Sequence, residues 1–161
     1  MAINKIAMLG AGTMGQGIAW ALAAVGKKVV LYDIKQEFVD RAIAAIGKSL
    51  AKAEERGKAA PGTKDTVVGN ITGTVNFDDL KDVDFVIEAV FENMEVKKDI
   101  YTKLDALLAP EVIIATNTSS LSITEIAAIT KRADKVVGMH FFNPANVMKL
   151  VEVIPALQTS E

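Results

Sequence analysis

The stretch Gly10-Ala11-Gly12-Thr13-Met14-Gly15 decides the fold expected for this chain of 161 residues. It follows Ile3–Leu9, an apolar run typical of a buried parallel strand, and it opens Thr13–Val25, an Ala- and Leu-rich helical segment closed by Gly26. In this pattern the first glycine makes a tight turn, the second lets a pyrophosphate approach the backbone, and the third lets helix and strand pack closely. The free N–H groups of the helix N-terminus favour an anion there. The stretch therefore predicts a dinucleotide-binding turn.

Strand-like and helical segments alternate along the rest of the chain. Strands are expected at Val29–Tyr32, Val83–Ala89, Val112–Ala115, Val136–Met139 and Lys149–Ile154, with a further possible strand at Asn70–Val75. Helices are expected at Glu37–Arg56, Met94–Leu108 and Ser122–Thr130, with Ser122 as N-cap, and Gly57–Thr66 is expected to be an exposed loop. The alternation predicts an α/β fold over residues 1–161, a Rossmann-type doubly wound and mostly parallel sheet with helices on both faces.

Asp33 ends the second expected strand, about 20 residues after the glycine turn, where the dinucleotide fingerprint places an acidic partner for the ribose 2′-OH. A carboxylate there would repel a 2′-phosphate, which favours NAD over NADP as the cofactor. Lys35 lies close by and weakens this discrimination. The alternative is that Asp33 only caps the next helix.

Composition excludes several classes of function. The net charge of −2 argues against general binding to nucleic acid or anionic membranes. The chain contains no cysteine, which excludes disulfides, thiol catalysis and cysteine-ligated metals. The apolar run Ile18–Val25 is too short to span a bilayer, and no secretory signal precedes it. We therefore expect a cytoplasmic protein.

The sole histidine, His140, follows the expected strand Val136–Met139, and Glu152 lies among apolar residues in the last expected strand. In open α/β sheets ligands bind beyond the carboxyl ends of the strands, so His140 is expected at the edge of a site. Its ordinary pKa of about 6.5 suits proton transfer near neutral pH, and a carboxylate partner would orient its ring. A structural histidine and a sheet-surface glutamate form an equally good alternative.

Asn117-Thr118-Ser119-Ser120 is a run of small polar residues after a buried strand. One interpretation is a plain turn with an N-cap. The other is a polar rim that contacts the nicotinamide end of the cofactor and a substrate oxygen.

With these motifs, the chain resembles the N-terminal domain of the L-3-hydroxyacyl-CoA dehydrogenases, including the 3-hydroxybutyryl-CoA dehydrogenases. The resemblance covers essentially the whole chain. It is carried by the glycine turn, Glu88-Ala89-Val90-Phe91-Glu92-Asn93, Asn117-Thr118-Ser119-Ser120, His140-Phe141-Phe142-Asn143-Pro144 and Met148-Lys149-Leu150-Val151-Glu152-Val153.

The resemblance implies roles for four residues in interconverting L-3-hydroxyacyl-CoA and 3-oxoacyl-CoA. His140 would be the general base that takes the proton of the 3-hydroxyl as hydride leaves for NAD, and Glu152 would hold and polarise it. Ser119 would hydrogen-bond the substrate oxygen, and Asn143 would support the same region. This chemistry requires no metal.

The resemblance also implies which residues bind the cofactor and the coenzyme A moiety. The residues that would contact NAD or line its site are those of the whole glycine turn, with Asp33, Ala89, Glu92, Lys97 and Asn117. Ser49 and Arg56, on the long helix, match positions near coenzyme A, although a solvated helix face would explain them equally simply.

The family has a second, helical domain that closes the substrate pocket and builds a homodimer, and no counterpart of it is present here. Thr159-Ser160-Glu161 resembles the opening of a helix cap. We therefore expect this chain to be part of a longer enzyme, to bind NAD, and to turn over poorly by itself. Two alternatives remain: a related β-hydroxyacid dehydrogenase of the 3-hydroxyisobutyrate or 6-phosphogluconate type, and a non-catalytic NAD(H)-binding module.

Overall fold

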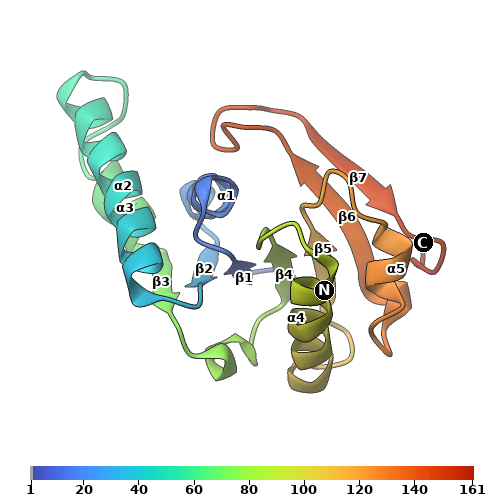
Figure 1. Cartoon of the computed structure of the whole chain (residues 1–161). Helices are drawn as coiled ribbons and strands as arrows, with labels where there is room; N and C mark the ends of the chain where they lie inside the picture. Colours follow the sequence, from blue (N-terminus) through green and yellow to red (C-terminus); the bar gives the residue numbers. More distant parts are fainter. Residues whose placement is uncertain (1) are drawn as a thin grey trace.

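The computed structural model describes residues 2–161 and contains a seven-stranded sheet flanked by helices (Figure 1). The strand order is β3-β2-β1-β4-β5-β6-β7, and all pairs are parallel except β6–β7. The strands are β1 (Lys5–Leu9), β2 (Lys28–Tyr32), β3 (Ile71–Thr74), β4 (Phe85–Glu88), β5 (Ile113–Thr116), β6 (Val136–Phe141) and β7 (Val151–Pro155). The helices are α1 (Thr13–Ala24), α2 (Gln36–Glu55), α3 (Thr63–Gly69), α4 (Met94–Leu107) and α5 (Ile123–Ala127). The predicted fold class is confirmed.

The alternating side chains of β1 explain why helices cover both faces of the sheet. Ile6 and Met8 belong to an apolar core shared with α1 and α2, whereas Ala7 and Leu9 belong to a second core shared with α4 and α5. All four are buried, because a strand in the middle of a doubly covered sheet has no face in water. Figure 1 shows α1 and α4 on opposite sides of the sheet. Within the described residues, no helix is both long and apolar enough to cross a membrane.

Parallel register brings three strand ends together at one edge. Leu9 pairs with Glu88, and Glu88 pairs with Thr116, so the last residues of β1, β4 and β5 lie side by side. The amide of Ala89 donates to the carbonyl of Leu9, and the amide of Asn117 donates to that of Glu88, both at 2.8 Å. The segments that follow these strands therefore start from neighbouring points.

The sheet is mostly parallel, as predicted, and β7 is its one antiparallel strand, because the loop after β6 is too short to cross over to the other end of the sheet. One local prediction was wrong. The predicted loop Gly57–Thr66 ends early, since α3 begins at Thr63 and buries Val67; its apolar stretch is too short to show periodicity. The Thr159 hydroxyl donates to the Val136 carbonyl and accepts from the Ala156 amide, and the helix cap expected at Thr159-Ser160-Glu161 stays a prediction.

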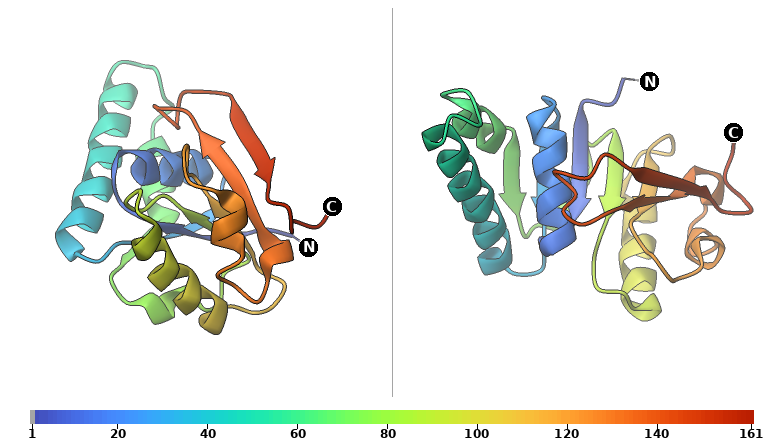
Figure 2. Two further views of the ribbon diagram at one scale, coloured as in Figure 1. Left: turned by 45° about the vertical axis from the view of Figure 1, so that its right-hand side comes forward. Right: turned by 90° about the horizontal axis from the view of Figure 1, so that it is seen from above.

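The hairpin formed by β6 and β7 also contacts helix α1. Figure 2 shows the loop between these strands extending toward α1. In this loop Ala145 is buried in the core beside α1, close to Gly17. The packing holds the end of β6, and with it His140, in a fixed position relative to the helix that follows the glycine turn.

The C-terminus of α4 is held by one buried arginine. The Arg132 guanidinium donates to the Asp105 carboxylate at 2.9 Å, to the carbonyls of Asp105 and Leu108 at 3.0 and 2.9 Å, and to the carbonyl of Ala109. These carbonyls have no partner within the helix, so the side chain completes their hydrogen bonding. Burial raises the pKa of Asp105, but the Lys131 amide and Arg132 outweigh it and hold this pKa below its usual value.

Arg132→Ala is expected to lower the free energy of unfolding by about 2–4 kcal/mol, because it leaves a nearly buried carboxylate and several carbonyls without a donor. Urea denaturation followed by circular dichroism measures the change. Lys98→Ala, which breaks the exposed Lys98–Glu95 pair on the same helix, is the control and should cost less than about 0.5 kcal/mol. Equal effects of the two substitutions would contradict this role of Arg132.

Candidate active site

The glycine turn has the geometry that its sequence predicts. Gly10 has a φ of 98°, a left-handed conformation in which a side chain is strained, and its Cβ would overlap the Ala89 carbonyl. A Cβ on Gly15 would overlap the carbonyl of Gly10, so α1 can start this close to the turn only with glycine there. The turn is therefore pressed between α1 and the end of β4.

Gly12 differs from its two neighbours because a Cβ built on it meets nothing within 4 Å. It is the N-cap of α1 and provides no side-chain cap, so the first N–H groups of the helix are not satisfied by a side chain. An open space above a helix N-terminus is a suitable place for a pyrophosphate. The residues present therefore fit a dinucleotide.

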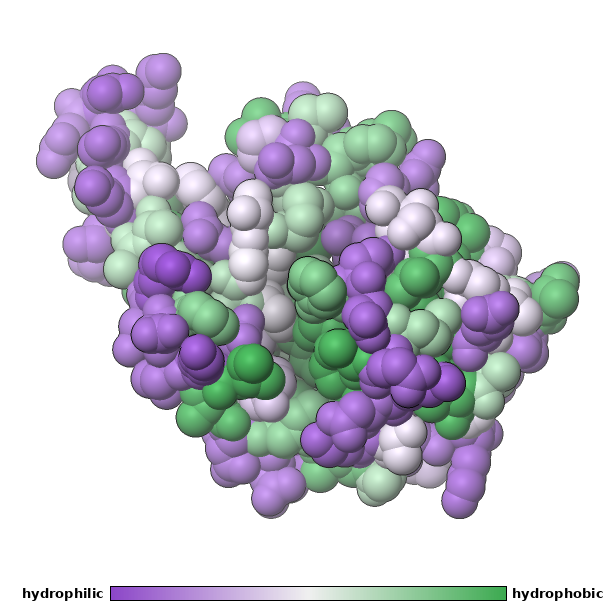
Figure 3. All heavy atoms as spheres, in the orientation of Figure 1, coloured by the Kyte–Doolittle hydropathy of each residue, from purple (hydrophilic) through white to green (hydrophobic). Residues whose placement is uncertain are grey.

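A cleft of about 940 Å³ runs from this turn between the segments that follow β2 and β4. Its walls are mostly apolar, with a few charged groups at the rim. They include Tyr32, Ile34, Phe38, Phe77, Phe91, Val96 and Ile100, together with Asp33, Arg41 and Lys103. Figure 3 shows apolar residues gathered around a hollow on this face. An apolar cleft with a few polar groups is typical of a site for a flat cofactor ring and a sugar.

Asp33 lies where the cleft meets the turn. Its Oδ2 accepts from the Ala11 amide and its Oδ1 from the Ile34 amide, both at 2.7 Å. It does not cap the next helix, because the N-cap of α2 is Lys35. The carboxylate thus joins the end of β2 to the glycine turn and faces the cleft, as the fingerprint requires.

A second cleft, of about 220 Å³, lies on the other side of the turn. Its lining combines residues that are far apart in sequence, and most of them are predicted site residues. They are Met14, Ala89, Val90, Glu92, Lys97, Asn117, Thr118 and Ser119. By contrast, Ser49 and Arg56 lie exposed on or next to α2, and neither lines one of these two clefts in the described part of the chain.

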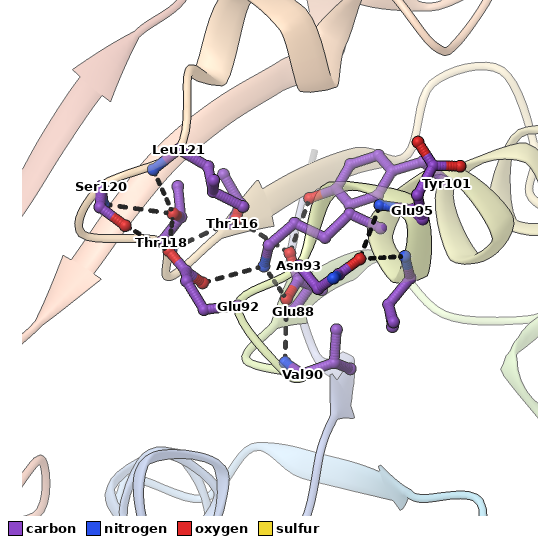
Figure 4. Close-up of polar contacts among 12 residues, drawn as sticks. Glu88, Val90, Glu92, Asn93, Glu95, Tyr101, Thr116, Thr118, Ser120 and Leu121 are labelled. Atoms are coloured by element: carbon purple, nitrogen blue, oxygen red, sulfur yellow. Dashed lines mark hydrogen bonds and ion pairs between the residues drawn. The ribbon is translucent and has the colours of Figure 1, made fainter.

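Beneath the smaller cleft, Lys97 and Glu88 form a buried ion pair, with Nζ and Oε1 2.7 Å apart and side chains 1% and 0% exposed (Figure 4). The sequence predicts a cofactor contact for Lys97 and no role for Glu88. One feature of the sequence could have indicated a role for Glu88. It is a charged residue at the end of the apolar strand Phe85–Glu88, and a buried charge requires a partner.

Glu92 connects this pair to the loop after β5. Its Oε2 lies 3.4 Å from the Lys97 ammonium, and its Oε1 accepts from the hydroxyls of Thr118 and Ser120. Burial raises the pKa of Glu92, but the Thr118 hydrogen bond and the Lys97 charge outweigh it, so the pKa lies below its ordinary value. The carboxylate is therefore ionised at neutral pH, and the loop that carries Ser119 is fixed from below.

His140 and Glu152 face each other across β6 and β7, with Nδ1 and Oε2 2.9 Å apart. The amide of the neighbouring Phe141 donates to Oδ1 of Asn117 at 2.8 Å, which ties this hairpin to the polar loop after β5. His140 and Glu152 are 22% and 49% exposed and line neither cleft. Asn143 lies exposed in the loop beyond β6.

This fold and site define a class of protein. The sheet is of the α/β type, with a glycine turn at the start of α1, an open space above Gly12 and a carboxylate at the end of β2. These features together are typical of a dinucleotide-binding domain. Residues 5–161 match the family model described as 3-hydroxyacyl-CoA dehydrogenase, NAD binding domain, and the chain belongs to this family.

Individual relatives agree with the family. The chain is 49% identical over 157 residues to a 3-hydroxybutyryl-CoA dehydrogenase of Clostridioides difficile, covering 98% of this chain and 56% of the relative. It is 43% identical over 158 residues to a 3-hydroxyadipyl-CoA dehydrogenase of Escherichia coli, covering 98% and 33%. The crystal structure of an (S)-3-hydroxybutyryl-CoA dehydrogenase from Ralstonia eutropha superposes with a TM-score of 0.96 at 46% identity, covering 99% and 56%. The chain thus spans about half the length of several relatives.

Gly12→Ala is expected to weaken NADH binding by at least about tenfold, because the methyl group would occupy the space proposed for the pyrophosphate. Its free energy of unfolding should change by less than about 1 kcal/mol, since the added Cβ meets no protein atom. Gly15→Ala is the contrasting variant and should lose stability, because its Cβ overlaps the Gly10 carbonyl. Calorimetric titration and urea denaturation measure both quantities. Unchanged NADH affinity in Gly12→Ala would place the phosphates elsewhere.

Proposed function

We propose that this chain is the NAD-binding and catalytic-base part of an enzyme that interconverts L-3-hydroxyacyl-CoA and 3-oxoacyl-CoA. The observation that carries the proposal is the His140–Glu152 pair, tied through Phe141 and Asn117 to the loop that contains Ser119. The names of the relatives support an acyl-CoA substrate.

Cofactor binding is divided between the two clefts. Gly10, Ala11, Gly12, Thr13, Met14 and Gly15 would hold the pyrophosphate, with Asp33 on the adenine ribose. Ala89, Glu92, Lys97 and Asn117 would line the nicotinamide half, where the smaller cleft gathers them. The bound NAD supplies a hydride acceptor.

Proton transfer is assigned to His140. With Glu152 at Nδ1, the neutral imidazole carries its proton there and leaves Nε2 free to accept the proton of the substrate 3-hydroxyl. The Glu152 carboxylate orients the ring and stabilises the imidazolium that results. Ser119 would donate to the substrate oxygen, and Asn143 would support the same region.

The remaining parts of the proposal concern groups outside the two clefts. Ser49 and Arg56, exposed at α2, would contact the coenzyme A moiety, where an arginine suits its phosphates. Assembly as a homodimer through a helical domain beyond these residues, and a cytoplasmic location, belong to the same proposal. The paired histidine favours this function over a non-catalytic module and over dehydrogenases that rely on a lysine base.

In the protein at the full length of its relatives, His140→Gln is expected to lower kcat with acetoacetyl-CoA by about 10²–10⁴-fold, because the proton then lacks a general acid–base group. The dissociation constant for NADH should stay within about twofold, since His140 lines neither cleft. Lys149→Gln, an exposed change on the same hairpin, should leave both values unchanged. Turnover of His140→Gln near the starting value would exclude His140 as the base.

The 161-residue chain by itself is expected to bind NADH but to reduce acetoacetyl-CoA poorly or not at all. The reason is that the His140 and Glu152 side chains are 22% and 49% exposed and line neither cleft, so water is not excluded from the reaction. Steady-state assays on the isolated chain and on the full-length protein measure the ratio. Near-equal kcat values would show that the isolated chain contains a complete site.

A further inference from the structure

The side chain of Glu88 uses its whole hydrogen-bonding capacity below the smaller cleft. Oε1 accepts from the Lys97 ammonium at 2.7 Å and from the Val90 amide at 2.9 Å. Oε2 accepts from the hydroxyls of Thr116 at 2.9 Å and Tyr101 at 3.3 Å. Four donors on one fully buried side chain fix its position and occupy both of its oxygens, so it has no free acceptor for a ligand.

Lys97 stands between this carboxylate and the cleft. Burying an ammonium group costs solvation free energy unless the group is paired, and the Glu88 carboxylate is its partner. One ammonium proton is directed to Glu88, and Glu92 lies 3.4 Å away on the cleft side. Lys97 therefore carries a positive charge to the floor of the smaller cleft while its position is set from beneath.

The same contacts continue into the loop that carries Ser119. The Lys97 ammonium contacts both Glu88 and Glu92, and Glu92 accepts from the Thr118 hydroxyl. Figure 4 shows Glu92 directed toward Thr118. The Thr118 hydroxyl in turn accepts from the Leu121 amide at 3.0 Å. The loop is thus held by Glu92, which contacts the ammonium that Glu88 positions, and by a hydrogen bond of its own.

We propose that Glu88 is a positioning residue for the nicotinamide half of the cofactor. It acts through Lys97 and Glu92, and so fixes the position of the Lys97 ammonium and of the loop Asn117–Leu121 at the wall of the smaller cleft. The inference rests on the proposed function for the identity of the ligand half. It assigns no direct contact between Glu88 and the cofactor.

The test compares two probes that differ only in the nicotinamide half. Glu88→Gln keeps an amide oxygen for the Lys97 ammonium but removes the compensating negative charge, so we expect NADH to bind at least about tenfold more weakly. ADP-ribose lacks the nicotinamide ring, so it should not depend on the wall of the smaller cleft and should bind within about twofold of its original affinity. Calorimetric titration of the described chain measures both. Equal weakening of both probes, or of neither, would overturn the proposal.

Asp105→Asn is the matched control for lost stability. It breaks the other buried ion pair of α4, Asp105–Arg132, whose side chains are 13% and 10% exposed, without touching either cleft. We expect this variant to lose stability and keep its affinity for both probes. Selective loss of NADH affinity in the control would also overturn the proposal, since that loss would then follow from instability.

A double substitution shows whether Glu88 acts through Lys97, even if Glu88→Gln alone does not fold. Glu88→Gln/Lys97→Met leaves no unpaired buried charge, so it is expected to fold. Its affinity for NADH should equal that of Lys97→Met alone, with both well below the original protein. NADH binding by Lys97→Met at the original affinity would contradict the inference. An absence of acyl-CoA turnover in the full-length protein would overturn the proposed function and leave this binding comparison intact.

Discussion

The parallel register of β1, β4 and β5 is the constraint on which the rest of the site depends. It sets Leu9, Glu88 and Thr116 side by side, so the glycine turn, the start of the α4 connection and the polar loop leave the sheet from adjacent positions. The Gly10 and Gly15 backbones then meet without side chains between them, which lets α1 begin close against the end of β1. A shift of register would separate the glycine turn from the smaller cleft.

Helix α4 has a fixed position relative to these strands because a buried or nearly buried ion pair anchors each of its ends. Near its start, Lys97 reaches Glu88 under the smaller cleft, and near its end Asp105 binds Arg132 from the segment after α5. Breaking either pair leaves a buried charge without compensation, which is far more costly than losing an exposed pair. The helix that forms one wall of both clefts is therefore held in position by electrostatics as well as by its apolar face.

Much of this arrangement could be predicted from local sequence. The geometry of the glycine turn and of Asp33 could be predicted, because it follows from local backbone conformation and from spacing along the chain. The pairing of His140 with Glu152 was predicted from a charge that required a partner in an apolar strand, and the antiparallel register places them opposite each other. Their catalytic roles stay predictions, as do those of Ser119 and Asn143.

Other features depend on contacts that no local pattern encodes. The direction of β7 follows from the length of a loop, and α3 contributes too little apolar surface to show a period. The network around Glu88 joins three separate segments, so its partners are known only once the strands are aligned. Lys97 shows the difference most clearly: the sequence predicts a cofactor contact, and the structure adds the buried carboxylate that holds it.

The central claim is that the glycine turn and Asp33 form a site for NAD in particular. Asp33 stands 2.7 Å from the Ala11 amide at the mouth of the larger cleft, where a 2′-phosphate would meet its negative charge. Calorimetric titration of the chain with NADH and with NADPH tests this most directly. The account predicts that NADPH binds at least about tenfold more weakly than NADH. Equal or tighter binding of NADPH would contradict it.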